Sequence, residues 1–128
     1  MKFRGLLVAL LGMGTAAGAA AAGPKAPPEH AVIVHFQYGS KDLSRLFSLE
    51  EKLEAAILAA RAGDFDGDEV AEDGSDGFLY MYGPDADRLY AAVKPVLEAC
   101  DFMRGARVTI RYGGPDDATP RKEVSVAP

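Results

Sequence analysis

His35 is the residue in this sequence whose type best suits catalysis, because an imidazole titrates near neutral pH and can serve as a general base. A hydrolase would also need a nucleophile beside it. The single cysteine, Cys100, falls at helical spacing with Leu89 and Leu97 and is predicted to be a small core residue. No serine lies in a Gly-x-Ser-x-Gly turn. The sequence therefore predicts no catalytic residue and no cofactor, and it favours a binding protein over an enzyme.

A run of carboxylates is the second candidate. Nine acidic residues and no basic residue lie between Arg61 and Arg88. Asp64, Asp66 and Asp68 have the alternate spacing of the first three ligands of a calcium loop, and carboxylate oxygens suit Ca²⁺. The pattern fails at the sixth position, which holds a glutamate instead of glycine, and at the twelfth, which holds a serine instead of glutamate. We therefore expect a solvated acidic turn rather than a metal site.

Two other roles for this acidic segment stay open. A small hydrolase or metal-assisted enzyme could use His35 with Asp66, Asp68 or Glu69, provided that these side chains converge in one pocket. The segment 64–76 could instead form an acidic surface that recognises a basic partner.

The third candidate is one face of a predicted β-sheet. Side chains alternate between the two faces of a strand, so the apolar residues should meet the helices and the polar ones should face outward. In the segment Phe78–Tyr82 this rule is ambiguous, since either the aromatic residues or the two residues between them could face outward. The candidate ligand or interface residues on this face are His35, Gln37, Tyr80, Tyr82, Arg107 and Arg111.

Two helices and four strands must position these residues. A capping box at Ser48 and Glu51 opens the first predicted helix, while Leu43, Leu46 and Phe47 could add a turn before it or form a loop against the core. Asp85 caps a second helix that contains Pro95. The predicted strands are His30–Tyr38, a short strand near Asp68–Glu72, Phe78–Tyr82 and Ala106–Tyr112. This βαββαβ order predicts an α+β fold of the ferredoxin-like kind, a sandwich with both helices on one face of a four-stranded antiparallel sheet.

The chain is expected to have four parts. Residues 1–22 have the basic start, apolar run and small-residue cleavage site of a secretory signal peptide. Residues 23–30 form an extended leader, 31–113 the α+β domain and 114–128 a flexible polar tail. Cleavage would leave 106 residues with 12 basic and 19 acidic side chains and no stable membrane anchor. We expect an exported protein, periplasmic or secreted, whose acidic balance argues against nucleic-acid binding.

The sequence also resembles small bacterial ferredoxin-like domains of unassigned function. The matching stretches include Leu46–Glu54, Phe65–Val70, Leu79–Leu89 and Val93–Leu97. The resemblance covers about residues 33–112, and it implies no activity. The residues themselves favour a non-enzymatic domain that uses its outward-facing sheet surface to self-associate as a homodimer, or to hold a protein or small ligand.

Overall fold

The computed structural model describes residues 29–128. The predicted signal peptide and all but the last two residues of the predicted leader lie outside these described residues. The elements are β1 (His30–Gln37), α2 (Ser44–Ala60), β2 (Asp64–Val70), β3 (Asp76–Gly83), α3 (Ala86–Glu98), the 3₁₀ turn η1 (Asp101–Met103), β4 (Arg107–Arg111) and β5 (Arg121–Ser125).

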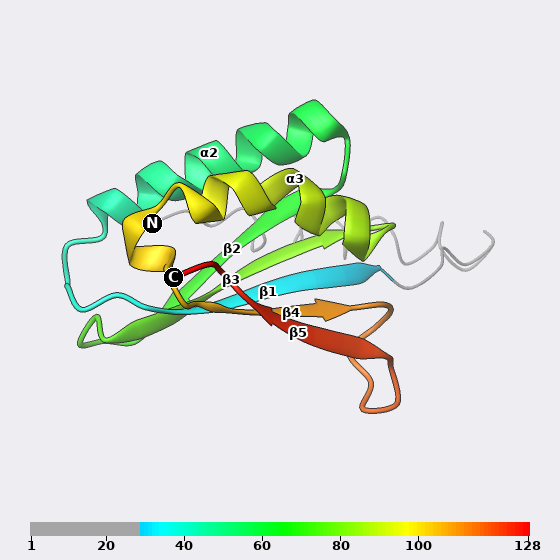
Figure 1. Ribbon diagram of the computed structural model, residues 1–128. Helices are drawn as coiled ribbons and strands as arrows, with labels where there is room; N and C mark the ends of the chain where they lie inside the picture. The colour runs from blue at the N-terminus through cyan, green and yellow to red at the C-terminus, as the bar shows by residue number, and fades with distance from the viewer. Residues whose placement is uncertain (1–28) are drawn as a thin grey trace, which may run out of the picture.

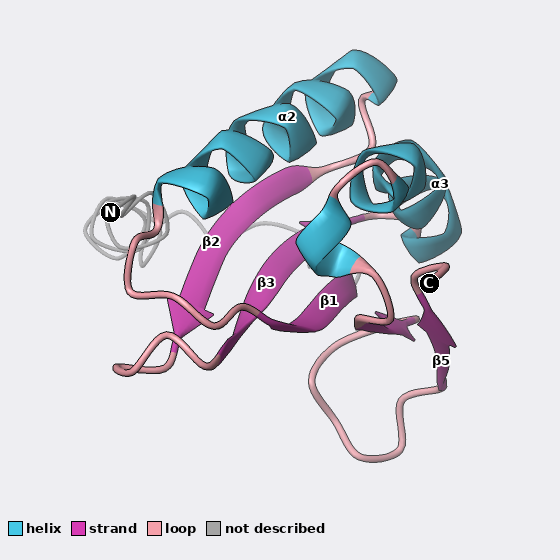
Figure 2. Cartoon of the chain, turned by 60° about the vertical axis from the view of Figure 1, so that its left-hand side comes forward, coloured by secondary structure: helices cyan, strands magenta, loops and turns pink. Residues whose placement is uncertain are grey.

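The protein has an α+β architecture, as the sequence predicts. The strands form one antiparallel sheet in the order β2-β3-β1-β4-β5. Both helices pack on one face of this sheet, which leaves the other face without a helix (Figures 1 and 2). We call this second surface the open face; it consists of the side chains that project from the sheet away from α2 and α3.

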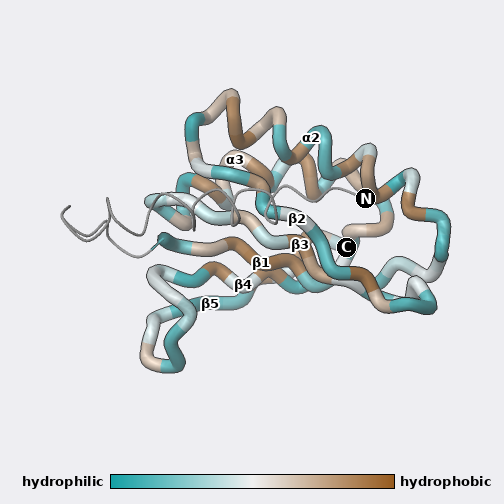
Figure 3. Tube along the Cα trace, turned by 180° about the vertical axis from the view of Figure 1, so that it is seen from behind, coloured by the Kyte–Doolittle hydropathy of each residue, from teal (hydrophilic) through white to brown (hydrophobic). Residues whose placement is uncertain are grey.

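The core lies between the sheet and the two helices. Alternate residues of β1, Val32, Val34 and Phe36, are buried there against Leu53 of α2 and Leu89 of α3. In Figure 3 the central strand β1 is coloured largely as hydrophobic, whereas the edge strand β5 is pale to hydrophilic. The alternation along β1 therefore confirms that its apolar set faces the helices.

Helix α2 begins five residues before the start that a cap at Ser48 predicts. Ser48 lies one turn inside the helix, and the helix starts at Ser44, whose backbone N–H and hydroxyl both donate to Asp42 Oδ1. These two bonds lower the pKa of the Asp42 carboxyl. The capping-box prediction was wrong because Leu46 extends the buried apolar stripe by a full turn toward the N-terminus.

The strand count also differs from the prediction, because a fifth strand lies in the segment 114–128 that was expected to be a flexible tail. Strand β5 pairs with β4 along its whole length. Val124 packs against the core and Val126, just beyond the strand, is 2% exposed. Val124 and Val126 alternate as in a strand, but two residues are a weak signal beside the charged residues that precede them.

Strand β2 starts at Asp64, whereas the sequence places a short strand near Asp68–Glu72. The carboxylates of residues 64–70 are therefore held on a strand rather than in a turn. The antiparallel pairing with β3 imposes this, since it satisfies backbone groups that a turn would leave to water.

Helix α3 is capped as predicted, and a second residue contributes. The Asp85 carboxylate accepts from the backbone N–H groups of Asp87 and Arg88. The backbone N–H of Ala86 donates to His30 Nδ1 at 3.0 Å. His30, which lies where the predicted leader meets the first predicted strand, thus links β1 to the start of this helix. Within residues 29–128, neither helix has the length and hydropathy needed to cross a bilayer.

Replacing Asp85 with alanine should lower the free energy of unfolding by about 1 kcal/mol, because two N–H groups of the first turn lose their acceptor. Asp85→Asn is the matched control, since asparagine caps helices about as well as aspartate. Urea unfolding followed by circular dichroism measures both variants. Equal losses in the two variants would contradict the capping role.

Candidate functional site

The structure resolves which side of β3 faces outward. Leu79 and Met81 are fully buried under the helices, so Phe78, Tyr80 and Tyr82 lie on the open face. The strand register then places these aromatic residues beside the predicted residues of β1 and β4. Phe78 pairs with His35, which pairs with Arg107 on its other side. All six residues predicted for a ligand or interface site come from strands β1, β3 and β4 and share this face.

A strip of stacked rings runs along the centre of the open face. The ring centroids of His35 and Phe78 are 4.4 Å apart, and the rings lie within 12° of parallel. Phe78 and Tyr80 continue the strip with centroids 6.2 Å apart. The rings are half-buried by one another, which makes the strip a rigid, largely apolar surface.

His35 is held by a carboxylate that the sequence analysis did not associate with it. The Nε2 atom of His35 lies 2.7 Å from Asp76 Oδ2, at the start of β3. Asp76 pairs in register with Gln37, two pairs along from His35 and on the same face, so only the strand register reveals this contact. The His35 ring is thereby fixed both by stacking and by a hydrogen bond.

The residues that a His35-dependent enzyme would require are not brought together. Phe78 lies between His35 and Glu69 in the register of three neighbouring strands. Asp68 pairs with Leu79, whose side chain faces the helices, so Asp68 lies on the helix side of β2. The structure therefore pairs His35 with Asp76 and not with the segment 64–69.

The tyrosines of β3 are tied to the acidic strand. The Tyr80 hydroxyl donates to Glu69 Oε1 at 2.5 Å. Burial first, and then this hydrogen bond and the Glu69 charge, raise the pKa of Tyr80 far above its usual range. Burial and the nearby Asp66 carboxylate raise the pKa of Tyr82. Both phenols therefore stay protonated at neutral pH, and Tyr80 acts as a neutral donor.

The acidic residues of β2 form one edge of the open face. Asp64 pairs with Tyr82, and a bulge between Phe65 and Gly67 adds Asp66 beside it. Asp64, Asp66 and Asp68 do not converge, since Asp68 lies on the opposite side of the strand from Asp64. Among residues 29–128 no group of three His, Cys, Asp or Glu side chains is placed to hold a metal ion.

Basic residues form the other side of the open face. Arg107 is exposed on β4, and Arg111 is 9% exposed with its Nε donating to the carbonyl of Gly113. Arg111 pairs in register with Arg121 of β5, so the two arginines share the face. Glu123, opposite Thr109, is the one acidic residue that β5 places on this face.

The open face is hollowed beside the end of β1. Gln37 is exposed at the end of β1, and with His35, Arg104 and Arg107 it lines a hollow of about 140 Å³. Ligand pockets usually measure about 300–1,000 Å³. This hollow is therefore smaller than an ordinary small-molecule site.

Several residues of this face were missed by sequence reasoning. Asp76 required the β1–β3 register, and Arg121 and Glu123 required the fifth strand. The alternating valines near the C-terminus were the signal that could have revealed β5. Cys100, predicted to be buried in the core, is half-buried at the end of α3, and burial raises the pKa of its thiol.

No protein-family model, curated protein or solved structure matches the chain. The resemblance to small bacterial domains noted in the sequence therefore stays a prediction, and any functional conclusion depends on the geometry of the molecule.

Proposed function

We propose that this protein is a non-enzymatic binding domain that self-associates as a homodimer through the open face of its sheet. We also assign it to the ferredoxin-like βαββαβ folds with an added edge strand. The strand order β2-β3-β1-β4, with α2 after β1 and α3 after β3, supports this assignment. Export to the periplasm or the medium remains part of the proposal, supported by the sequence of residues 1–22.

The main support for the proposal is that acidic residues lie on one side of the open face and basic residues on the other. Asp64, Asp66 and Glu69 line the β2 edge, and the aromatic strip fills the centre. Arg107, Arg111 and Arg121 line the opposite side. Such a surface is complementary to a second copy of itself turned by a half-rotation, because an isologous contact brings the same patch to both partners.

The strand order fixes which two-fold axis achieves this complementarity. An axis parallel to the strands and passing over the central strand β1 places β2 against β5 of the second copy, and β3 against its β4. Asp64 and Asp66 then face Arg121 of the second copy. The ring of Phe78 faces the exposed Arg107 of the second copy, an arrangement that favours a cation–π contact. An axis perpendicular to the strands would instead oppose like charges.

Sedimentation equilibrium on the chain from residue 23 onward tests self-association. This shortened chain keeps the whole described sheet, both helices and the core that they share. We expect a monomer–dimer equilibrium that weakens several-fold between low salt and about 0.5 M NaCl, because screening reduces the paired edge charges. A monomer at every concentration and salt condition would refute the proposed function.

A further inference from the structure

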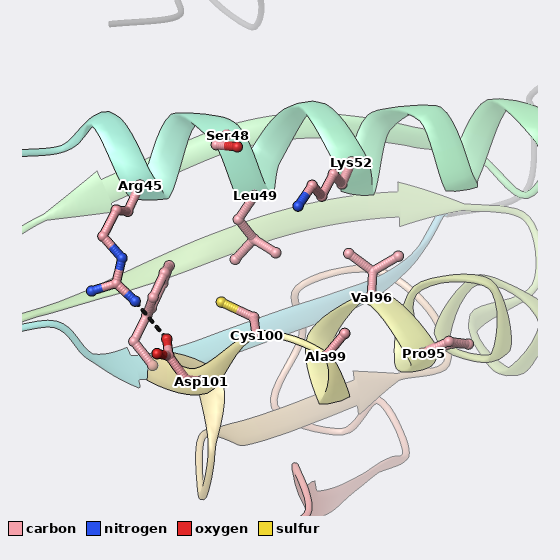
Figure 4. A pocket seen from close by; sticks show the side chains of 10 residues that line it. Arg45, Ser48, Leu49, Lys52, Pro95, Val96, Ala99, Cys100 and Asp101 are labelled. Carbon is pink, nitrogen blue, oxygen red and sulfur yellow. Dashed lines mark hydrogen bonds and ion pairs between the residues drawn. The ribbon is translucent and has the colours of Figure 1, made fainter.

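A groove on the helix side of the molecule is a second candidate site, remote from the open face. It has a volume of about 690 Å³ and lies between α2 and the C-terminal end of α3, with η1 closing one end (Figure 4). Arg45, Ser48, Leu49 and Lys52 line it from α2, since these positions recur at helical spacing. The volume falls within the range of small-molecule sites.

The floor of the groove is apolar. Leu49 and Val96 face each other across it (Figure 4), and Ala99, Cys100 and Phe102 also line it. Leu49 is 4% exposed, so it belongs to the core beneath, whereas Val96 and Phe102 are only partly buried. An apolar chain lying here would remove these partly exposed groups from water, which is favourable.

The two cations on the α2 side differ in their partners. Arg45 Nη2 donates to Asp101 Oδ1, and the Arg45 guanidinium lies 4.9 Å from the centroid of the Phe102 ring. Its charge is therefore matched within the protein. Lys52 forms no ion pair with any described residue. The groove thus combines an apolar floor with one unmatched positive charge at its rim.

We propose that this groove binds an anionic amphiphile, a carboxylate on a single apolar chain such as a medium-chain fatty acid. The carboxylate pairs with Lys52 and the chain lies over Leu49, Val96 and Ala99. One unmatched ammonium group suits one negative charge, and the groove provides no cluster of cations for a phosphate group. This proposal is independent of dimer formation, because the groove and the open face lie on opposite sides of the sheet.

Cys100 provides a direct reporter of occupancy. Its sulfur points into the groove beside Leu49 (Figure 4), and it is the only cysteine in the chain. A bound chain would cover the thiol. We expect saturating decanoate, kept below its micelle concentration, to slow the reaction of Cys100 with iodoacetamide at least threefold, as measured by mass spectrometry. An unchanged rate up to the solubility limit of decanoate would overturn the proposal.

Two variants test the assigned contacts in the same assay. Lys52→Gln should weaken protection by decanoate about threefold to fivefold and leave protection by the neutral decanol unchanged, since a partly exposed ion pair contributes modestly. Lys41→Gln, in the loop before α2 and outside the groove, is the matched control. Equal effects of Lys52→Gln on decanoate and decanol would contradict a charge contact.

Ala99→Leu should weaken the binding of both decanoate and decanol about tenfold, because the larger side chain occupies the floor of the groove. Ala99 is exposed and follows α3 in a right-handed helical conformation, so leucine fits its backbone. Urea unfolding confirms that this variant folds. Unweakened binding of both probes to the folded variant would place them elsewhere on the protein and refute the proposed groove.

Discussion

Reversing the charge of either edge of the open face should abolish self-association, and mixing the two reversed proteins should restore it. Asp64→Lys combined with Asp66→Lys gives one variant, and Arg121→Glu gives the other. In the proposed dimer each edge of one copy faces the opposite edge of its partner. Each variant alone therefore brings like charges together at both ends of the interface, which costs several kcal/mol in total. All three residues are exposed and belong to the edge strands β2 and β5.

The mixture is the decisive measurement. In a heterodimer of the two variants every edge contact again joins opposite charges, so sedimentation should reveal a dimer in the mixture although each variant alone is a monomer. Glu123→Gln on the same strand is a matched control and should leave the dimer intact, because Glu123 faces Gly67 of the second copy in the proposed arrangement. Failure of the mixture to associate would exclude an axis parallel to the strands.

Gly63→Ala should cause a large loss of stability. Gly63 joins α2 to β2 with a φ of 145°, and an added Cβ would lie 2.0 Å from the carbonyl oxygen of Tyr82. That oxygen belongs to the backbone of β3 and cannot move without displacing the sheet. The variant thus suffers both backbone strain, about 1–3 kcal/mol, and a steric clash of similar cost.

Gly67→Ala measures the cost of backbone strain without the steric clash. Gly67 has nearly the same φ, 144°, but a Cβ added there would meet no atom within 4 Å. The free energy of unfolding of Gly63→Ala should therefore be at least about 2 kcal/mol lower than that of Gly67→Ala. Urea unfolding of both in the Arg121→Glu background removes any contribution from association. Equal losses would mean that β3 relaxes away from residue 63.

The local pattern of the sequence was sufficient to predict most of the helices and strands. Alternation along β1 and β4 assigned Val34 and Val108 to the core and His35 and Arg107 to the open face. The helical stripe of α3 and its Asp85 cap were equally readable, because these features depend on neighbours within a few residues. The start of α2 was misplaced because a Ser-x-x-Glu pattern occurs inside a longer apolar stripe.

The candidate surfaces were only partly predictable, because contacts between distant segments depend on register. In the segment Phe78–Tyr82, aromatic residues alternate with aliphatic ones, and either set could be buried. Packing against the helices selected Leu79 and Met81 for the core and left the rings outside. The pairing of His35 with Asp76 and the groove beside Cys100 likewise join residues from separate elements.

The sequence by itself determined the α+β class, the acidic run before α3 and the basic alternation of β4, since these follow from residue types and short-range periodicity. The tertiary structure alone decided that the acidic and basic residues lie on opposite edges of one face, with aromatic rings between them. Strand order and register set that arrangement, and both are fixed by the way the whole core packs. The fifth strand became visible for the same reason: Val124 and Val126 indicate a strand only once there is a core for them to cover.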